Sequence, residues 1–412
     1  MSGEHQPFGA LSDIRIIDLT QMLAGPYGAM VLADHGAQVI KIEPPGRGDM
    51  TREAGGAQSG MGPYFQSINR NKESVCLDLK SDEGKAVFKS LLKDADAVIE
   101  NFRAGVMERL GLGWEVLREI NPRLVYGCLR GFGDHRTGAS PYNDWPAFDV
   151  VAQAMGGIMA ITGPDAKTPT KVGPGVGDIV PGMMLAFGVL SAIHHARRTG
   201  QGQFVDVSMV DAVLAVCERM VWQHSAQAVT PGPEGNHHPF LVPFGMFPAA
   251  DGHVTIAAQQ EGVFERLCEL LGAGGILADP RFGTRAARSE NRLALIAAVG
   301  EVTGRLTKAQ LVARLGGHIP FGPVMDIAEI EADPHFAARE MIVEVEPFGA
   351  EPLRIAGVPI KLTLTPGGVR RRAPRLGENT IDRLREAGLT EAEIAGLIER
   401  RVAAATPQEP TT

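Results

Sequence analysis

The sequence predicts an α/β fold, in which a doubly wound parallel sheet forms a Rossmann-like large domain and a smaller α+β domain follows. Short β-rich runs alternate with helical stretches through residues 13–227, as in a parallel sheet with crossover helices. A polar segment rich in proline and glycine, 229–240, then interrupts the alternation. The 412 residues suffice for about two or three domains. We therefore expect the large domain to begin with 1–228 and the small domain to occupy 229–330.

The first βαβ unit lies near the amino terminus. Residues 13–19 (DIRIIDL) and 38–43 (QVIKIE) are β-rich, and an apolar helical stretch separates them. Pro26 suits the first turn of this helix, and Gly36 suits its carboxyl end. Because the two strands are joined by a crossover helix, we expect them to pair in parallel.

The same alternation continues through the rest of the large domain. Ser81 is a candidate N-cap for a helix at 82–94, because acidic residues follow it in the first turn. Further strands are expected at 74–79, 96–100, 124–129 and 203–208, and further helices at 148–160, 183–197 and 209–227.

The small domain has a different pattern. Residues 244–258 alternate as in a β-hairpin, and three helices are expected at 261–271, 291–303 and 307–315. Beyond it the chain is again β-rich over 342–362. Residues 402–412 are expected to form a disordered tail.

Composition excludes several classes of protein. The net charge of −8 argues against a nucleic-acid binder, which usually carries a basic surplus. The chain also has 50 glycines and 28 prolines without a Gly-X-Y period. This content predicts many tight turns, or a backbone that closely approaches another group.

The spacing of the cysteines and the first residues of the chain indicate the cellular compartment in which we expect the protein. The four cysteines are far apart and form no C-x-x-C pair, so neither a zinc site nor a disulfide framework is predicted. The first residues lack the pattern of a secretory signal, and no apolar run reaches about 18 residues. We expect a cytoplasmic protein without a membrane span.

Common catalytic and nucleotide-binding signatures are absent. The chain has no P-loop, no G-x-S-x-G and no H-E-x-x-H, and its first βα turn lacks G-x-G-x-x-G. The pairs His194–His195 and His237–His238 are adjacent in sequence, so neither pair can share one helix face. We expect no metal site.

The segment 173–182 (GPGVGDIVPG) carries the most chemical information. Asp178 is its only carboxylate, and the surrounding glycines would let a ligand approach the backbone. A carboxylate there can act as a nucleophile, and nearby backbone N–H groups can stabilise an oxyanion. The alternative is that Asp178 caps the helix that follows.

Several longer motifs occur in a fixed order along the chain. They are DLTQMLAGPYG, QVIKIEPPGRGD, NRNKESVCLDLK, NFRAGVMERLG, VGDIVPGM, RRTGQGQFVDVSMVDA, FGPVMDIAEIEADP, GVPIKL and APRLGENT. From about residue 8 to 400 the chain resembles the class III CoA-transferases. This family includes carnitine-type, formyl-CoA-type and succinyl-CoA-dependent transferases and the related 2-methylacyl-CoA racemases.

The resemblance implies that Asp178, in its Val-Gly-Asp motif, is the acyl acceptor. It would form an aspartyl anhydride with the donor acyl group and then an aspartyl-CoA thioester. CoA thioesters and small carboxylic acids would be substrates, with no tightly bound cofactor. Positions matching the family's CoA contacts are Leu23, Ala24, Leu77, Lys80, Asn101, Phe102, Arg109 and Arg130. Positions matching its substrate cleft are Gln21, Phe148, Asp149 and Gly177.

One position separates transfer from racemisation. The racemases carry a histidine base in a Gly-His-Asp triplet, where this chain has Ala147, Phe148 and Asp149. Phenylalanine cannot accept a proton, so the resemblance favours transfer, and an acyl-CoA racemase is the alternative. Asp149 is expected either in the cleft or as the N-cap of a helix over 150–156.

The resemblance also carries expectations about assembly and specificity. It implies an interlocked, ring-like homodimer, with residues 331–401 returning to the large domain. A CoA-binding arginine of one relative corresponds to Pro44, so Arg47 or Arg52 is expected to replace it. The long glycine-rich loop of formyl-type enzymes is missing near 239–246, and we expect succinyl-CoA or a similar donor.

Overall fold

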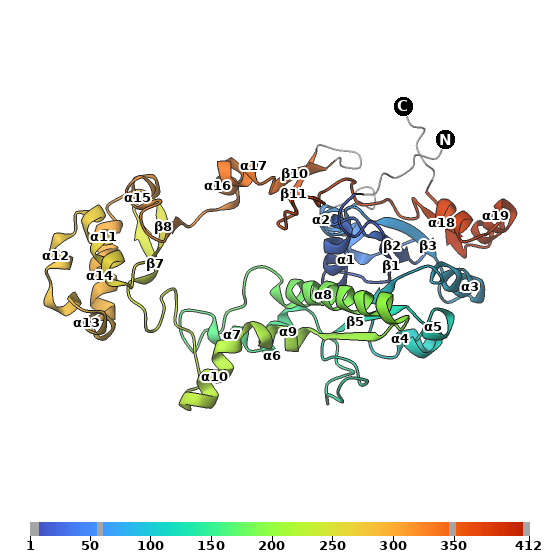
Figure 1. Cartoon of the computed structure of the whole chain (residues 1–412), viewed down its shortest axis with the longest axis horizontal. Coiled ribbons are helices and arrows are strands. Elements are labelled where there is room, and N and C mark those ends of the chain that lie inside the picture. The colour runs from blue at the N-terminus through green and yellow to red at the C-terminus, as the bar shows by residue number, and fades with distance from the viewer. Residues whose placement is uncertain (1–7, 56–60, 346–351, 407–412) are drawn as a thin grey trace. The chain divides into compact units, whose positions relative to one another are not determined.

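The computed structural model describes residues 8–55, 61–345 and 352–406. The chain divides into two compact units (Figure 1). The first consists of Met1–Ile158, Lys171–Ala226 and His335–Thr412, and the second of Met159–Thr170 and Gln227–Pro334. The short segment 159–170, which lies inside the range expected for the large domain, therefore belongs to the second unit.

A seven-stranded sheet forms the centre of the first unit, in the order β12-β3-β2-β1-β4-β5-β6. The strands are β1 (Arg15–Asp18), β2 (Gln38–Glu43), β3 (Glu73–Leu77), β4 (Ala97–Glu100), β5 (Val125–Arg130), β6 (Phe204–Ser208) and β12 (Ala403–Ala404). β1 to β6 pair in parallel, which confirms the predicted parallel sheet. The strand order reverses at β1, which pairs with β2 on one side and β4 on the other.

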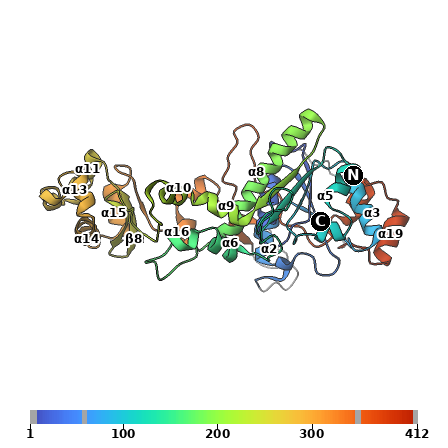
Figure 2. The ribbon, with the colours of Figure 1, turned by 90° about the horizontal axis from the view of Figure 1, so that it is seen from below.

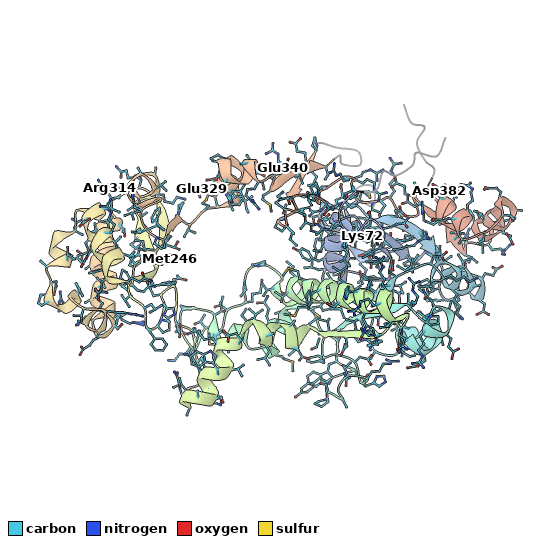
Figure 3. The ribbon with its side chains drawn as sticks, viewed as in Figure 1. Lys72, Met246, Arg314, Glu329, Glu340 and Asp382 are labelled. Carbon is cyan, nitrogen blue, oxygen red and sulfur yellow. The ribbon has the colours of Figure 1, made fainter. Side chains whose placement is uncertain are left out.

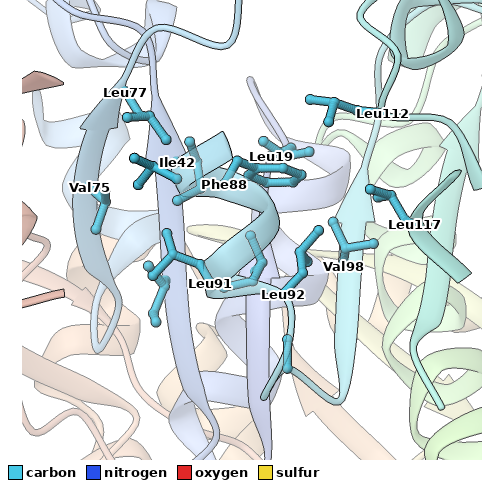
Figure 4. Close-up of a cluster of buried hydrophobic side chains, with 14 of the residues drawn as sticks. Leu19, Ile42, Val75, Leu77, Phe88, Leu91, Leu92, Val98, Leu112 and Leu117 are labelled. Atoms are coloured by element: carbon cyan, nitrogen blue, oxygen red, sulfur yellow. The ribbon is translucent and has the colours of Figure 1, made fainter. Parts of the chain in front are cut away.

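Helices cover both faces of this sheet. Neighbouring residues of β1 point to opposite faces, so Ile17 joins a core with Phe88 and Ile16 joins a second core with Leu185. Helix α8 (Val176–Thr199) lies on one side of the strands, and α3 (Asp82–Leu91), α5 (Trp114–Ile120) and α19 (Glu391–Glu399) lie on the other (Figure 2). Figure 4 shows Phe88 and Leu91 of α3, and Leu92 directly after it, packed among strand side chains.

The helices of the first unit confirm most of those predicted from the sequence. They are α1 (Ala24–Asp34), η1 (Met50–Glu53), α2 (Pro63–Asn69), α3 (Asp82–Leu91), α4 (Val106–Arg109), α5 (Trp114–Ile120), α6 (Asp149–Met155), α8 (Val176–Thr199), α9 (Met209–Val216), α18 (Thr380–Glu386) and α19 (Glu391–Glu399). Ser81 caps α3 as predicted, since its Oγ accepts a hydrogen bond from Gly84 N at 3.0 Å. The single helix expected over 148–160 is divided at Gly156 and Gly157 into α6 and α7 (Ile158–Ile161). The single helix expected over 209–227 is divided at Cys217 into α9 and α10 (Glu218–Gln227).

Helix α8 begins earlier than predicted. The sequence suggests a start at 183 because a glycine- and proline-rich run precedes it, yet the helix starts at Val176 and contains Pro181. Tight packing explains the glycine at 182, because a Cβ there would lie 2.4 Å from Ala24 O of α1. Of the described helices, α8 alone is long and apolar enough to cross a bilayer. An uninterrupted run of about 18 apolar residues does not occur in it, as the sequence predicts, since Asp178 precedes its apolar stretch and His194 follows it. Its buried side chains pack into the core beneath the sheet.

The carboxyl-terminal part of the first unit also differs from expectation. Ala403 and Ala404 form β12, which pairs with Leu77 and Cys76 in antiparallel fashion. The prediction of a disordered tail is therefore wrong for residues 402–406, and 407–412 lie outside the described residues. The β-rich region near 342–362 forms an antiparallel hairpin of β10 (Ile342–Val345) and β11 (Leu353–Ala356).

The second unit combines a three-stranded antiparallel sheet with helices. Its strands are β7 (Phe244–Ala249), β8 (Gly252–Ala257) and β9 (Phe321–Pro323), and the predicted hairpin is confirmed by the β7–β8 pairing. Its helices are α11 (Glu261–Leu271), α12 (Gly274–Leu277), η2 (Pro280–Phe282), α13 (Arg285–Glu290), α14 (Arg292–Thr303), α15 (Lys308–Leu315) and α16 (Ile327–Ala332). Three boundaries between the units fall in α7 (Ile158–Ile161), α10 and α17 (Pro334–Ala338), and the fourth lies between Thr170 and Lys171. Figure 3 labels Met246 and Arg314 in this unit.

Candidate active site

A cavity of about 350 Å³ lies in the first unit at the carboxyl ends of the parallel strands. The turn after β1 and the segment after β4 both line it. These two strands are neighbours, and the strand order reverses between them. In open α/β sheets, ligands bind at this topological switch point, outside the carboxyl ends of the strands.

Eight of the residues proposed for the site line this cavity. They are Gln21, Leu23, Ala24, Asn101, Phe102, Arg130, Phe148 and Asp178. The sequence motifs that carry these residues are far apart along the chain. The fold brings them together because β1, β4 and β5 lie side by side and α8 packs against α1.

Asp178 is half-buried in the wall of the cavity, in the first turn of α8. Burial, and then the negative charge of Asp149, raises the pKa of Asp178 from 3.8 to about 7. Within the described residues, no hydrogen bond or ion pair engages its carboxylate. The side chain is therefore available to a ligand, and its charge changes near neutral pH.

The capping alternatives for the two carboxylates are both wrong. The N-cap of α8 is Gly175, and the N-cap of α6 is Phe148. Asp149 instead accepts a hydrogen bond from Gly177 N at 2.8 Å, and both of its oxygens accept from Gln153. These contacts fasten the start of α8 to α6.

The close approach of α6 explains why position 177 is a glycine. A Cβ on Gly177 would lie 2.6 Å from the backbone oxygen of Asp149. The first amides of α8 are already bonded within the protein, since Val176 N donates to Pro174 O and Asp178 N to Gly175 O. The expectation that these amides stabilise an oxyanion is therefore wrong for this conformation.

Arg130 lines the cavity but is largely neutralised. Its guanidinium pairs with Glu100 at 2.9 Å and also with Asp134. Burial opposes ionisation of Arg130, but these carboxylates outweigh it and raise its pKa further. Asp134 also binds Arg136, so each charged side chain of this cluster has an oppositely charged partner within the protein. Arg130 is therefore a fixed part of the wall rather than a free cation.

The other proposed residues lie outside the lining of this cavity. Leu77 is buried in the core, and Lys80 and Arg109 are exposed. The expectation that Arg52 replaces the family arginine is wrong, because its guanidinium forms a buried pair with Glu43 at 2.6 Å. Arg47 is exposed and lies outside the cavity.

The lining also contains residues that were not among the predicted site residues, including Met50, Tyr64, Arg103 and Trp145. Arg103 had a signal, since it directly follows Asn101 and Phe102 in a quoted motif. In the described part of the chain its side chain has no hydrogen bond or ion pair. Burial, and then the charge of Asp178, raises the pKa of Tyr64, which therefore stays protonated as a hydrogen-bond donor.

The site is built from carboxylates, amides, arginines and aromatic rings. No three His, Cys, Asp or Glu side chains are grouped as metal ligands within the described ranges. A half-buried carboxylate with a pKa near 7 can attack an electrophilic carbonyl. The Arg103 side chain, which has no ion pair with another described residue, can hold an anionic ligand in the same cavity.

Comparison with known proteins identifies the family. Residues 11–380 match CoA-transferase family III. The chain is 48% identical to succinyl-CoA:mesaconate CoA-transferase of Haloarcula hispanica, over 92% of this chain and 97% of that protein. It is 36% identical to succinate–glutarate CoA-transferase of Agrobacterium fabrum, over 91% and 95% of the two chains.

A solved structure shares the fold. The crystal structure of a CAIB/BAIF family protein from Brucella suis superposes with a TM-score of 0.83 at 33% identity, covering 92% of this chain and all of that chain. The family match spans most of the sequence, and the relatives cover nearly its full length. The chain therefore belongs to CoA-transferase family III and is a CoA-transferase.

Proposed function

We propose that this enzyme moves CoA from a dicarboxylyl-CoA donor, succinyl-CoA, to a carboxylic acid acceptor, with Asp178 as the nucleophile. The observation that carries the proposal is the Asp178 carboxylate, half-buried in the cavity wall and free of protein partners among the described residues. The names of two relatives, succinyl-CoA:mesaconate and succinate–glutarate CoA-transferase, support the choice of donor.

The reaction proceeds in four exchanges at the Asp178 carboxyl group. Its oxygen attacks the donor thioester carbonyl, the C–S bond breaks, and a mixed anhydride and CoA thiolate result. The thiolate attacks the aspartyl carbonyl, releasing the donor acid and leaving an aspartyl-CoA thioester. The acceptor carboxylate attacks this thioester and displaces the thiolate. The thiolate then attacks the acceptor carbonyl, which yields the new acyl-CoA and restores Asp178.

The cavity residues have separate roles in this proposal. Arg103 is available to pair with a phosphate of CoA, whereas Arg130 braces the wall. The protonated Tyr64 hydroxyl would donate a hydrogen bond to the bound ligand, because Tyr64 also lines the cavity. Lys80 and Arg109, which are exposed and lie outside the cavity lining, would contact the distal end of CoA, and Leu77 is buried in the core.

We also propose that two copies form the functional assembly, in the cytoplasm. Apolar side chains remain exposed on α8 and α9, including Met183, Phe187 and Leu214, and Phe187 is 76% exposed. A second copy would cover such a surface, as an interlocked homodimer does. Analytical ultracentrifugation tests this assembly, and a sedimentation coefficient of a single chain at micromolar concentration would contradict it.

The covalent step is tested by trapping. The wild-type protein is incubated with succinyl-CoA and hydroxylamine, and tryptic peptides are read by mass spectrometry. The proposal predicts a hydroxamate at Asp178 and a loss of transfer of at least about a thousandfold in Asp178→Ala. A fully active Asp178→Ala enzyme, or rapid α-deuterium incorporation without transfer in deuterated water, would overturn it.

A further inference from the structure

The turn that follows β1, Thr20 to Leu23, forms part of the cavity wall. Its conformation is unusual, because Met22 has a φ of 68°. Residues other than glycine seldom adopt this left-handed region, and they remain there only where the surrounding structure holds them. The neighbours of the turn therefore decide its shape.

Side chains from three strands hold the backbone of the turn. Asp18 of β1 accepts hydrogen bonds from both Thr20 N, at 2.8 Å, and Thr20 Oγ1. After β4, Asn101 binds Gln21 twice, accepting from Gln21 N and donating to Gln21 O, each at 2.8 Å. From β2, Lys41 Nζ donates to Thr20 O at 2.6 Å.

Lys41 forms an ion pair with Asp49, and each of the two side chains also contacts the backbone of the turn. Its Nζ lies 2.9 Å from Asp49 Oδ2, and the two side chains are 1% and 0% exposed. Asp49 Oδ1 accepts from Thr51 N at 2.9 Å and, more weakly, from Met22 N at 3.4 Å. Neither Lys41 nor Asp49 lines the cavity. The pair thus contacts the turn at Thr20 O and Met22 N without reaching the ligand space.

The same buried cluster extends away from the site. Asp18 also pairs with Lys72 at 2.9 Å, and both side chains are fully buried. Figure 3 labels Lys72 in the first unit. Burying charged groups is costly unless each is paired, so the cluster can adopt few alternative arrangements. A rigid cluster of this kind fixes the backbone groups that it binds.

We propose that the Lys41–Asp49 pair positions the Thr20–Leu23 turn for CoA binding. Both are positioning residues rather than catalytic residues. The inference rests on the proposed function only in taking CoA as the ligand of this cavity. Lys41 and Asp49 belong to the QVIKIEPPGRGD motif but do not line the cavity. The inference gives these two residues a role in ligand binding.

The test compares two double variants that each remove one buried ion pair. Lys41→Met/Asp49→Asn removes the pair that holds the turn. The matched control, Arg70→Met/Asp34→Asn, removes a pair of 2.8 Å whose side chains are both 4% exposed and which contacts neither the turn nor the cavity. Calorimetry measures the Kd of free coenzyme A, and steady-state assays with succinyl-CoA separate KM from kcat.

The expected result is a Kd for coenzyme A raised about tenfold in Lys41→Met/Asp49→Asn, with KM rising more than kcat falls. The control is expected to bind within about twofold of wild type, whatever its melting temperature. Equal losses in both variants, or an unchanged Kd in the first, would overturn the inference.

A milder variant covers the case in which the double variant does not fold. Asp49→Asn keeps the Oδ1 acceptor for the backbone N–H groups of Thr51 and Met22. It removes the negative charge that pairs with Lys41. It is expected to raise the Kd about threefold, and an unchanged value would overturn the inference. The wild-type measurement tests the proposed function by itself: if the wild-type protein does not bind coenzyme A, the proposed function is wrong. The comparison of the variants with wild type tests only the role of the ion pair.

Discussion

The pH dependence of transfer reports directly on the pair Asp178 and Asp149. Burial and the charge of Asp149 raise the pKa of Asp178 from 3.8 to about 7. This difference corresponds to roughly 4 kcal/mol against ionisation. Only the ionised carboxylate attacks a thioester, so the reactive fraction is about 0.1 at pH 6 and about 0.9 at pH 8. We expect kcat/KM to rise about tenfold between these values.

The perturbation is Asp149→Asn. The amide oxygen can still accept from Gly177 N, so the start of α8 remains fastened while the negative charge is removed. The pKa of Asp178 then falls, although burial still holds it above 3.8. The midpoint of the pH profile moves to lower pH, and a larger share of full activity remains at pH 6.

The assay is kcat/KM for succinyl-CoA between pH 5 and 9 with a fixed acceptor. Asp82→Asn, at a fully exposed carboxylate on α3, serves as the control and leaves the midpoint unchanged. A profile that is flat from pH 6 to 8, or a midpoint that Asp149→Asn fails to lower, would refute the reasoning.

Two further predictions concern packing and the buried cations. Gly182→Ala places a Cβ 2.4 Å from Ala24 O, so we expect a loss of about 1–3 kcal/mol in the free energy of unfolding. Gly262→Ala, on α11 with open space around it, is expected to raise stability slightly, and equal effects of the two in urea titrations would contradict this account. Arg130→Met leaves Glu100 buried without its cation and is expected to cost about 3–5 kcal/mol in thermal or urea unfolding. A neutral effect would show that Arg130 is not needed to compensate Glu100.

The sheet was predictable because its signals are local. β-branched runs mark β1 and β2, a serine caps α3, and helices between strands require parallel pairing. The start of α8 was not predictable in this way. Gly177 and Gly182 lower the helix propensity of this segment, and the contacts of α8 with α6 and α1 compensate for it.

The candidate site was predictable in part, because its residues lie in recognisable sequence motifs. The motifs indicated Asp178, Gln21 and Asn101, and the cavity brings these residues together. The state of each charge depends on partners distant in sequence, which no motif reveals. Arg130 meets Glu100 from another strand, and Arg52 is paired with Glu43, whereas Arg103 has no such partner in the described ranges.

The order in which the sheet is assembled along the chain constrains how this protein folds during synthesis. The edge strand β12 comes from residues 403 and 404, although it pairs with β3 near residue 77. The intervening chain, including the whole of the second unit, leaves the ribosome before β3 receives this partner. Because β12 is an edge strand of only two residues, the backbone of β3 stays uncovered on this side until residues 403 and 404 have been synthesised. Until then, this edge of β3 is open, and an open strand edge is a surface on which chains can pair with one another.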